Sequence, residues 1–154
     1  MATPATMTNP ARIKIRKALR KDAEQLAELT TQLGYPSTPA ELRTRLSQLR
    51  PAGKHTVFVA DVTGTGVIGW LHVSATNLLE IDLRAEVNGL VVAEGQRSLG
   101  AGAKLIAAAE EWARRQGCKT MNVRSNVIRD RAHKFYERQG YEHYKTQKAF
   151  RKPL

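Results

Sequence analysis

The chain has 154 residues, of which 42% are hydrophobic and 25% charged, a composition typical of one ordinary globular domain. Its formal net charge of +11 favours polyanionic partners such as nucleic acid or a phosphate-rich cofactor, although a solvated basic surface would have the same composition. There is no apolar run near the ~20 residues of a membrane span, residues 1–10 lack the apolar region expected of a secretory signal, and the single cysteine, Cys118, excludes an internal disulfide. We therefore expect a disordered tail at 1–10 and one cytoplasmic domain at 11–154.

The chain begins its regular structure with a strand and a helix. The segment 12–18, RIKIRKA, alternates apolar and basic residues and predicts a short strand. Asp22 and Gln25 have the spacing of a capping box, and leucines then recur at helical spacing until Gly34. This pattern predicts a first helix that begins at Asp22.

A second helix has clearer signals at its ends. Thr38 is the expected N-cap, Pro39 occupies the first helical position, and Glu41 completes a capping box. Leucines at helical spacing follow until Pro51, which ends the helix.

Three strands follow the helices. TVFVADV and VIGWLHV, joined by TGTG, predict a β-hairpin, and a third strand runs from near Glu80 to Val92. Strand periodicity divides this third strand into two faces. The polar face is Glu80, Asp82, Glu86 and Asn88, and the apolar face is Ile81, Leu83, Ala85 and Val87.

The last part of the chain alternates helices and strands. After GQRSLGAG at 95–102 we expect a helix that ends before Gly117, a strand at 119–125, a helix at 130–140 and a final β-hairpin in YEHYKTQKAF. The complete order of elements predicts an α/β (α+β) fold. Its mixed, mostly antiparallel central sheet has about seven strands, with helices on both faces.

The segment 95–102 carries three glycines and an arginine between a strand and a helix. Glycines let the backbone turn tightly, so that the free amides of a helix N-terminus point toward an anion. Arg97 adds a side-chain donor. The spacing R-x-x-G-x-G at Arg97, Gly100 and Gly102 matches neither a P-loop nor the dinucleotide fingerprint. It predicts a phosphate-binding loop. A tight turn that binds no ligand is the alternative.

Two motifs resemble the GNAT superfamily of acyl-CoA-dependent N-acyltransferases. LVVAEGQRSLGAGAKLIAAAEEWARRQG resembles its motif A, and SNVIRDRAHKFYERQGY resembles its motif B. The asparagine often found three residues before the motif B alanine is Arg129 here, so that Asn126 is the residue left to contact the coenzyme. The resemblance implies a GNAT-like fold and transfer of an acetyl group from acetyl-CoA to an amine.

The resemblance also implies a set of coenzyme-binding residues. Backbone groups of Leu90, Val91 and Val92 would pair with the pantetheine arm beside the strand at 119–125; ordinary strand packing of their side chains is compatible with this role. The pyrophosphate would lie on the loop and the start of the helix. These residues are Arg97, Ser98, Leu99, Gly100, Ala101, Gly102 and Ala103.

Two residues are candidates for the chemistry. Tyr136 matches the family tyrosine near the coenzyme sulfur, and because a phenol titrates near 10 and a thiol near 8.5, we expect a hydrogen-bond donor rather than a full proton donor. Core packing is the alternative for this residue. Glu86 resembles in position the strand glutamate that some members use as a base, often through water, with Asp82 and Glu80 assisting; water alone or a solvated strand face is the alternative.

The remaining candidates are weaker. His133 lies near Tyr136 and could relay a proton, whereas His55, His72 and His143 are isolated in the sequence, and no spacing suggests a metal site. Trp70 shares a strand face with His72 and could line an acceptor pocket; core packing is the alternative for Trp70.

The sequence thus predicts an acetyl-CoA-dependent N-acetyltransferase that acts by direct transfer in a ternary complex. The alternatives are a catalytically weak acyl-CoA-binding module and a basic nucleic-acid-binding domain. We expect acetyl-CoA as co-substrate, no metal, a small-molecule or peptide amine as acceptor, and neither membrane nor nucleic acid as partner. A homodimer is left open.

Overall fold

A computed structural model of the protein describes residues 12–49, 53–97 and 99–154. The predicted tail at 1–10 lies outside these residues. The described chain divides into two compact units, one up to Val123 and one from Arg124 to Leu154. We describe each unit by itself.

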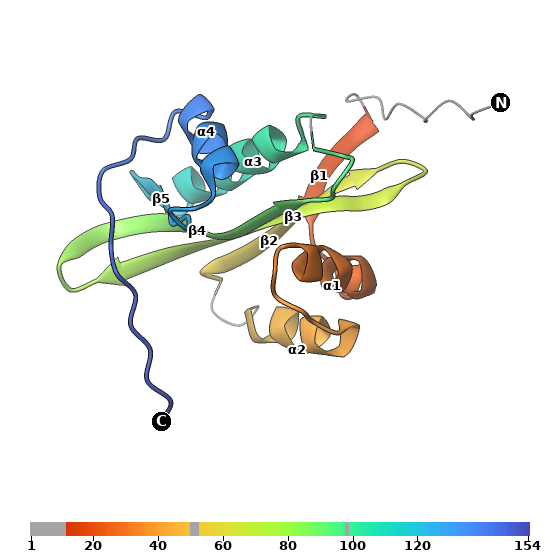
Figure 1. The fold of residues 1–154 in the computed structure, drawn as a ribbon, viewed down its shortest axis with the longest axis horizontal. Helices are drawn as coiled ribbons and strands as arrows, with labels where there is room; N and C mark the ends of the chain where they lie inside the picture. Colours follow the sequence, from red (N-terminus) through yellow and green to blue (C-terminus); the bar gives the residue numbers. More distant parts are fainter. Residues whose placement is uncertain (1–11, 50–52, 98) are drawn as a thin grey trace. The chain divides into compact units, whose positions relative to one another are not determined.

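The first unit is built on a sheet with the strand order β1-β2-β3-β4-β5 (Figure 1). The strands are β1 (Ile13–Lys17), β2 (His55–Val62), β3 (Gly66–Leu78), β4 (Ile81–Val92) and β5 (Met121–Val123). Neighbouring strands from β1 to β4 are antiparallel, and β5 is parallel to β4. The α/β class and the mostly antiparallel sheet are therefore confirmed.

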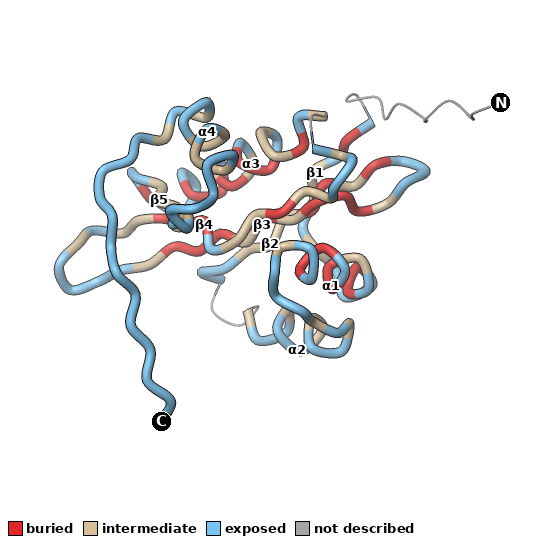
Figure 2. Tube along the Cα trace, viewed as in Figure 1, coloured by how far each residue is buried: buried red, intermediate tan, exposed pale blue. Residues whose placement is uncertain are grey.

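Helices lie on both faces of this sheet (Figure 1). The first unit contains the short 3-10 helix η2 (Arg20–Asp22), α1 (Ala23–Gln32), α2 (Pro39–Leu49) and α3 (Ala101–Arg115), and the second unit contains α4 (Asp130–Arg138). On one face, Leu26 and Leu29 of α1 pack with Val91 of β4. On the other face, Leu105 of α3 lies against Gly69. Figure 2 shows buried residues concentrated in the strands, α1 and α3.

The start of α1 differs from the prediction. Asp22 forms no side-chain cap; its carboxylate accepts hydrogen bonds from the Leu19 amide at 2.7 Å and from the Arg16 guanidinium at 2.8 and 2.9 Å. Gln25 instead accepts a hydrogen bond from the Val67 amide. The capping box was therefore wrong here, because a buried carboxylate beside an arginine gains more from that ion pair than from a helix amide.

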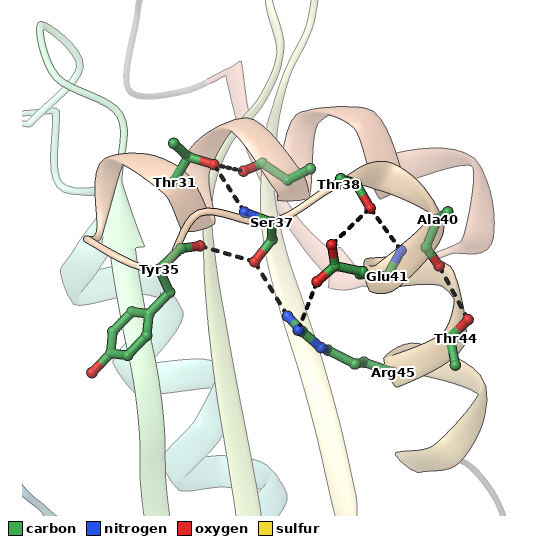
Figure 3. Close-up of polar contacts among 9 residues, drawn as sticks. Thr31, Tyr35, Ser37, Thr38, Ala40, Glu41, Thr44 and Arg45 are labelled. Atoms are coloured by element: carbon green, nitrogen blue, oxygen red, sulfur yellow. Dashed lines mark hydrogen bonds and ion pairs between the residues drawn. The ribbon is translucent and has the colours of Figure 1, made fainter.

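The start of α2 agrees with the prediction (Figure 3). The Glu41 amide donates a hydrogen bond to the Thr38 hydroxyl at 3.2 Å, which is the N-cap contact that the sequence predicts. The Glu41 carboxylate accepts from the Thr38 hydroxyl and from Arg45. The helix therefore begins at Pro39, with its cap in place.

The predicted C-terminal hairpin is wrong. Residues 141–154, all of which the structure describes, form neither strand nor helix, and the described chain has five strands rather than about seven. Tyr144 and Phe150 are 65% and 92% exposed. The aromatic residues of the segment stand at 141, 144 and 150, which is not the alternation of a strand, and the segment lacks the Gly, Asn or Asp that tight hairpin turns favour.

A bulge in β4 changes which residues share a face. Val73 pairs with Val87 and His72 with Gly89, so Asn88 is an extra residue in the ladder. Glu80 lies in the turn before β4 rather than in the strand. Glu86 therefore lies within β4 with a paired strand on each side, whereas the prediction that Glu80 belongs to the polar face of the strand is wrong.

Candidate functional site

The loop before α3 has the backbone that its glycines predict. Gly100 is the N-cap of α3 and has φ 80°, a left-handed conformation that disfavours residues with a side chain. The first intrahelical amide bond is from Lys104 to Gly100, so the amides of Ala101, Gly102 and Ala103 have no acceptor within the helix. The first turn of α3 has no acidic residue. This end of α3 is therefore suited to an anion.

Two further loop residues stand beside this helix end. Arg97 is exposed, and its Nε donates to the Val92 carbonyl at 3.3 Å, which ties the arginine to the end of β4. The remaining guanidinium donors are available to a ligand. Leu99 precedes Gly100 and is partly buried. Ser98 lies outside the described residues.

The end of β4 has strand pairing on one edge. Leu90, Val91 and Val92 pair with Leu71, Trp70 and Gly69 of β3. β5 pairs with β4 only through Ala85–Val87, so no described strand pairs with residues 90–92 on that side. The backbone of these three residues can therefore bind an extended polar chain, as an edge strand does.

Glu86 lies in a polar row that crosses the sheet. Ser74 pairs with His55 on β2 and with Glu86 on β4, and Glu86 pairs with Asn122 on β5. Cross-strand partners project from the same face. The Asn88 amide group donates to the Ser74 hydroxyl at 2.8 Å, so the bulge residue is joined to the row.

Two histidines that are far apart in the sequence meet on this same face. His55 Nδ1 lies 2.9 Å from His72 Nε2, and the rings are 5.2 Å apart. Burial lowers the pKa of His72 to about 4, and the charge of His55 adds to this shift. The expectation that these histidines are isolated is therefore wrong, because the β2–β3 register brings them together.

Trp70 lies on the same face as His72, as the sequence predicts. Trp70 pairs with Val59 and Val91, and its ring lies where a side chain on Gly89 would be, 2.8 Å from an added Cβ. The indole Nε1 is buried and forms no hydrogen bond with the described residues. The absence of a side chain at Gly89 therefore makes room for this indole.

Tyr136 and Asn126 belong to the second unit. Desolvation raises the pKa of Tyr136 above its ordinary value, against the opposing effect of Arg129, so the phenol keeps its proton at neutral pH. The side-chain oxygen of Asn126 accepts a hydrogen bond from the Ile128 amide, and the backbone carbonyl of Asn126 lies 2.8 Å from His133 Nε2. His133 is thus bound to the turn before α4.

Two residues of the polar face, Ser74 and Arg84, were not singled out in the sequence. Ser74 and the paired state of His55 depend on register between strands, which a single sequence does not reveal. Arg84 pairs with Thr76, two residues before Glu86 on the same face. The strand parity that identified Glu86 could also have identified Arg84.

No helix among the described residues is long and apolar enough to cross a membrane. In the same residues, no group of three or more His, Cys, Asp and Glu side chains could hold a metal ion.

The glycine-arginine turn before α3 and the free edge at the end of β4 lie in the segments where the two sequence motifs place a coenzyme. The chain matches the acetyltransferase (GNAT) family over residues 20–141. It belongs to this family of acyl-CoA-dependent acyltransferases.

Individual relatives agree with this assignment. The chain is 39% identical over 66 residues to an aminoalkylphosphonate N-acetyltransferase of Salmonella typhimurium, a match that spans 42% of this chain and 43% of that relative. It is 25% identical over 130 residues to the aminoglycoside N(6')-acetyltransferase type 1 of Serratia marcescens, covering 82% of this chain and 89% of the relative.

Solved structures share the fold. The aminoglycoside N-acetyltransferase AAC(6')-Iy in complex with CoA is similar with a TM-score of 0.81 at 21% identity, over 92% of this chain and 95% of that chain. A GNAT family acetyltransferase of Staphylococcus aureus is similar with a TM-score of 0.72 at 24% identity, over 93% and 99% of the two chains.

Proposed function

We propose that the protein transfers an acetyl group from acetyl-CoA to a primary amine, directly and within a ternary complex. The observation that carries this proposal is the left-handed Gly100 at the N-terminus of α3, next to Arg97, in a chain of the GNAT family. We further propose that residues 11–154 act as one catalytic domain, since the family match crosses from the first unit into the second.

The coenzyme would be held by two groups of residues. Arg97, Gly100 and the amides of residues 101–103 bind the pyrophosphate, because a helix N-terminus and a guanidinium both favour an anion. Leu90–Val92 hold the pantetheine arm through the backbone edge that lacks a described strand partner. We assign Asn126 a contact with the coenzyme through its side-chain amide NH₂, since its carbonyl oxygen already accepts a bond from Ile128.

Glu86 is our candidate base. An alkyl amine with a pKa near ~10 is mostly ammonium at neutral pH and must lose a proton before it attacks a thioester. Glu86 lies half-buried on the face with Ser74 and Asn122, where its carboxylate, directly or through a water, removes that proton. Asp82, exposed on the same strand, attracts the ammonium group.

Tyr136 is our candidate donor to the departing thiolate. Because desolvation raises the pKa of its phenol, complete transfer of the proton to a thiolate is unfavourable. Tyr136 therefore acts by donating a hydrogen bond to the negative charge that develops on sulfur. With Cys118 buried and its thiol pKa raised by that burial, an acetyl-cysteine intermediate is disfavoured.

The acceptor is, in our proposal, a small amine with one or two positive charges or the amino group of an amino acid or peptide. The names of two relatives give an aminoalkylphosphonate and an aminoglycoside as their substrates. The net charge of +11 opposes the approach of a polycation. That opposition is screened beyond ~8 Å at physiological salt, so the carboxylates near Glu86 decide the final docking.

Release of free thiol from acetyl-CoA across an amine library tests the proposal. The library contains monoamines, amino acids, peptides and aminoglycosides, and kcat/KM is measured at low and high salt. We expect the highest values for small acceptors. An aminoglycoside with kcat/KM above ~10⁵ M⁻¹s⁻¹ and far above every small amine would overturn the acceptor class. Coenzyme binding without turnover of any amine would instead indicate a binding module.

The variant Glu86→Gln tests the base. It should lower kcat/KM at pH 7 by about 10²-fold, which is the lower range for a general base. Because the free amine becomes abundant near its own pKa, the defect should shrink between pH 7 and pH 10. Glu111→Gln, at an exposed glutamate of α3, is the matched control. A defect that stays constant with pH would show that Glu86 positions the acceptor without removing a proton.

A further inference from the structure

Arg84 is a charged residue for which the proposed reaction has no role. It lies on the same face of β4 as Glu86, because Arg84 pairs with Thr76 and Glu86 with Ser74 in one uninterrupted part of the register. Its side chain is half-buried. It forms no hydrogen bond or ion pair with any residue that the structure describes, although Asp82 and Glu86 lie two positions away on either side.

Arg84 is half-buried and has no side-chain partner among the described residues. Partial removal of a charge from water costs free energy unless an opposite charge or hydrogen-bond acceptors replace the water. A guanidinium also presents a planar fork of donors that matches a carboxylate or a phosphonate. Arg84 therefore has the chemistry of an anion-binding residue whose partner is not part of the folded chain.

The position of Arg84 along the strand indicates where that anion would lie. The order along β4 is Arg84, Glu86 and then the free edge at Leu90–Val92. Two strand residues on one face are separated by about 7 Å. An amine held by Glu86 between Arg84 and the thioester would thus have its far end close to the guanidinium.

We propose that the acceptor is an amine that also carries an anionic group, with its nitrogen at Glu86 and its carboxylate or phosphonate at Arg84. This inference rests on the proposed function and narrows the class of acceptor to amines with an anionic group. The hydroxyls of Thr76 and Ser74, opposite the two charged residues, supply further polar contacts. A polycationic acceptor is disfavoured, because its additional ammonium groups would meet Arg84.

Four acceptors of similar length separate the contributions: propylamine with a neutral end, β-alanine with a carboxylate, 2-aminoethylphosphonate with a phosphonate, and 1,3-diaminopropane with a second cation. In the wild type, kcat/KM for one of the two anionic acceptors should exceed that for propylamine by about 10- to 100-fold, the range for a charge-assisted hydrogen bond. The ranking of β-alanine and 2-aminoethylphosphonate identifies the anion.

Two variants test the residue. Arg84→Gln should lower kcat/KM for the preferred anionic acceptor to about the level of propylamine and leave propylamine unchanged, and Arg84→Lys should fall between. Arg115→Gln, at an exposed residue of α3, is the control. A general loss for all four acceptors, or wild-type values equal for propylamine and both anionic acceptors, would overturn the inference.

Binding without turnover separates this inference from the proposed function. Calorimetry with CoA present measures binding of β-alanine and 2-aminoethylphosphonate directly. If no amine is acetylated but an anionic acceptor binds wild type at least ~10-fold tighter than Arg84→Gln, the proposed reaction fails while the anion site stands. If amines are acetylated with no dependence on Arg84, the reaction stands and the anion site fails.

Discussion

His55 Nδ1 and His72 Nε2 share a hydrogen bond of 2.9 Å across the β2–β3 ladder, where one imidazole donates and the other accepts. His55 is exposed and His72 is half-buried. Burial then holds the pKa of His72 at about 4.

The pair predicts a dependence of stability on pH. The ordinary pKa of histidine is 6.5, so between about pH 6.5 and 4 the unfolded chain binds a proton that folded His72 does not. The free energy of unfolding should therefore fall as pH decreases through this window. Thermal unfolding from pH 7.5 to 4 measures it, and His72→Gln should flatten the curve. A pKa near 6.5 for His72, measured by NMR titration, would contradict the prediction.

Gly100→Glu should abolish binding of acetyl-CoA. The substitution places a negative charge where the pyrophosphate is expected and forces a side chain into φ 80°, a strain of roughly 1–2 kcal/mol. Gly64→Glu is a matched control, because Gly64 has φ 82° and equally open surroundings but lies in the β2–β3 turn. Calorimetry should detect coenzyme binding by Gly64→Glu and none by Gly100→Glu. Unchanged affinity in a folded Gly100→Glu protein would remove this loop from the coenzyme site.

Tyr136→Phe should lower kcat by about 10²-fold and leave the affinity for acetyl-CoA unchanged. Since the phenol pKa lies above its ordinary value, the wild-type rate should not decline through ionisation of Tyr136 at neutral or mildly alkaline pH. Steady-state kinetics and coenzyme titration measure the two quantities. Tyr144→Phe, at an exposed residue, is the control. Full turnover in Tyr136→Phe would assign the residue to packing.

Asp22→Asn should destabilise the fold by about 3 kcal/mol, the lower value for breaking a buried ion pair, because Arg16 retains Asp61 at 3.0 Å. Burial acts to raise the pKa of Asp22, but hydrogen bonds from Arg16 and the Leu19 amide outweigh it and hold the pKa below 3.8. This stabilisation is present above pH 3.8 and is lost as pH falls through the folded pKa.

Urea unfolding at pH 7 and pH 3 measures the effect of Asp22→Asn. Asp61→Asn should cost less, because Asp61 is about one-third exposed. If Asp22→Asn is as stable as the wild type, the attraction within the ion pair only offsets the free energy lost when its charges leave water.

The sequence by itself determined the features that depend on neighbours in the chain. The alternation at Ile13–Lys17, the Thr38 cap and the turn before α3 each arise from residues a few positions apart, and the structure has all three. The GNAT family assignment likewise came from two local motifs and is confirmed. The roles of Glu86 and Tyr136 stay predictions.

Only the tertiary structure decided the features that depend on strand register and burial. The extra residue at Asn88 in the β3–β4 ladder removes it from the regular alternation of β4, and the β2–β3 register joins His55 to His72, which are 17 residues apart in the sequence. Such contacts are set by which strands pair and by what the pairing removes from water. The spacing of residues within one strand does not reveal which residues of the neighbouring strand they pair with.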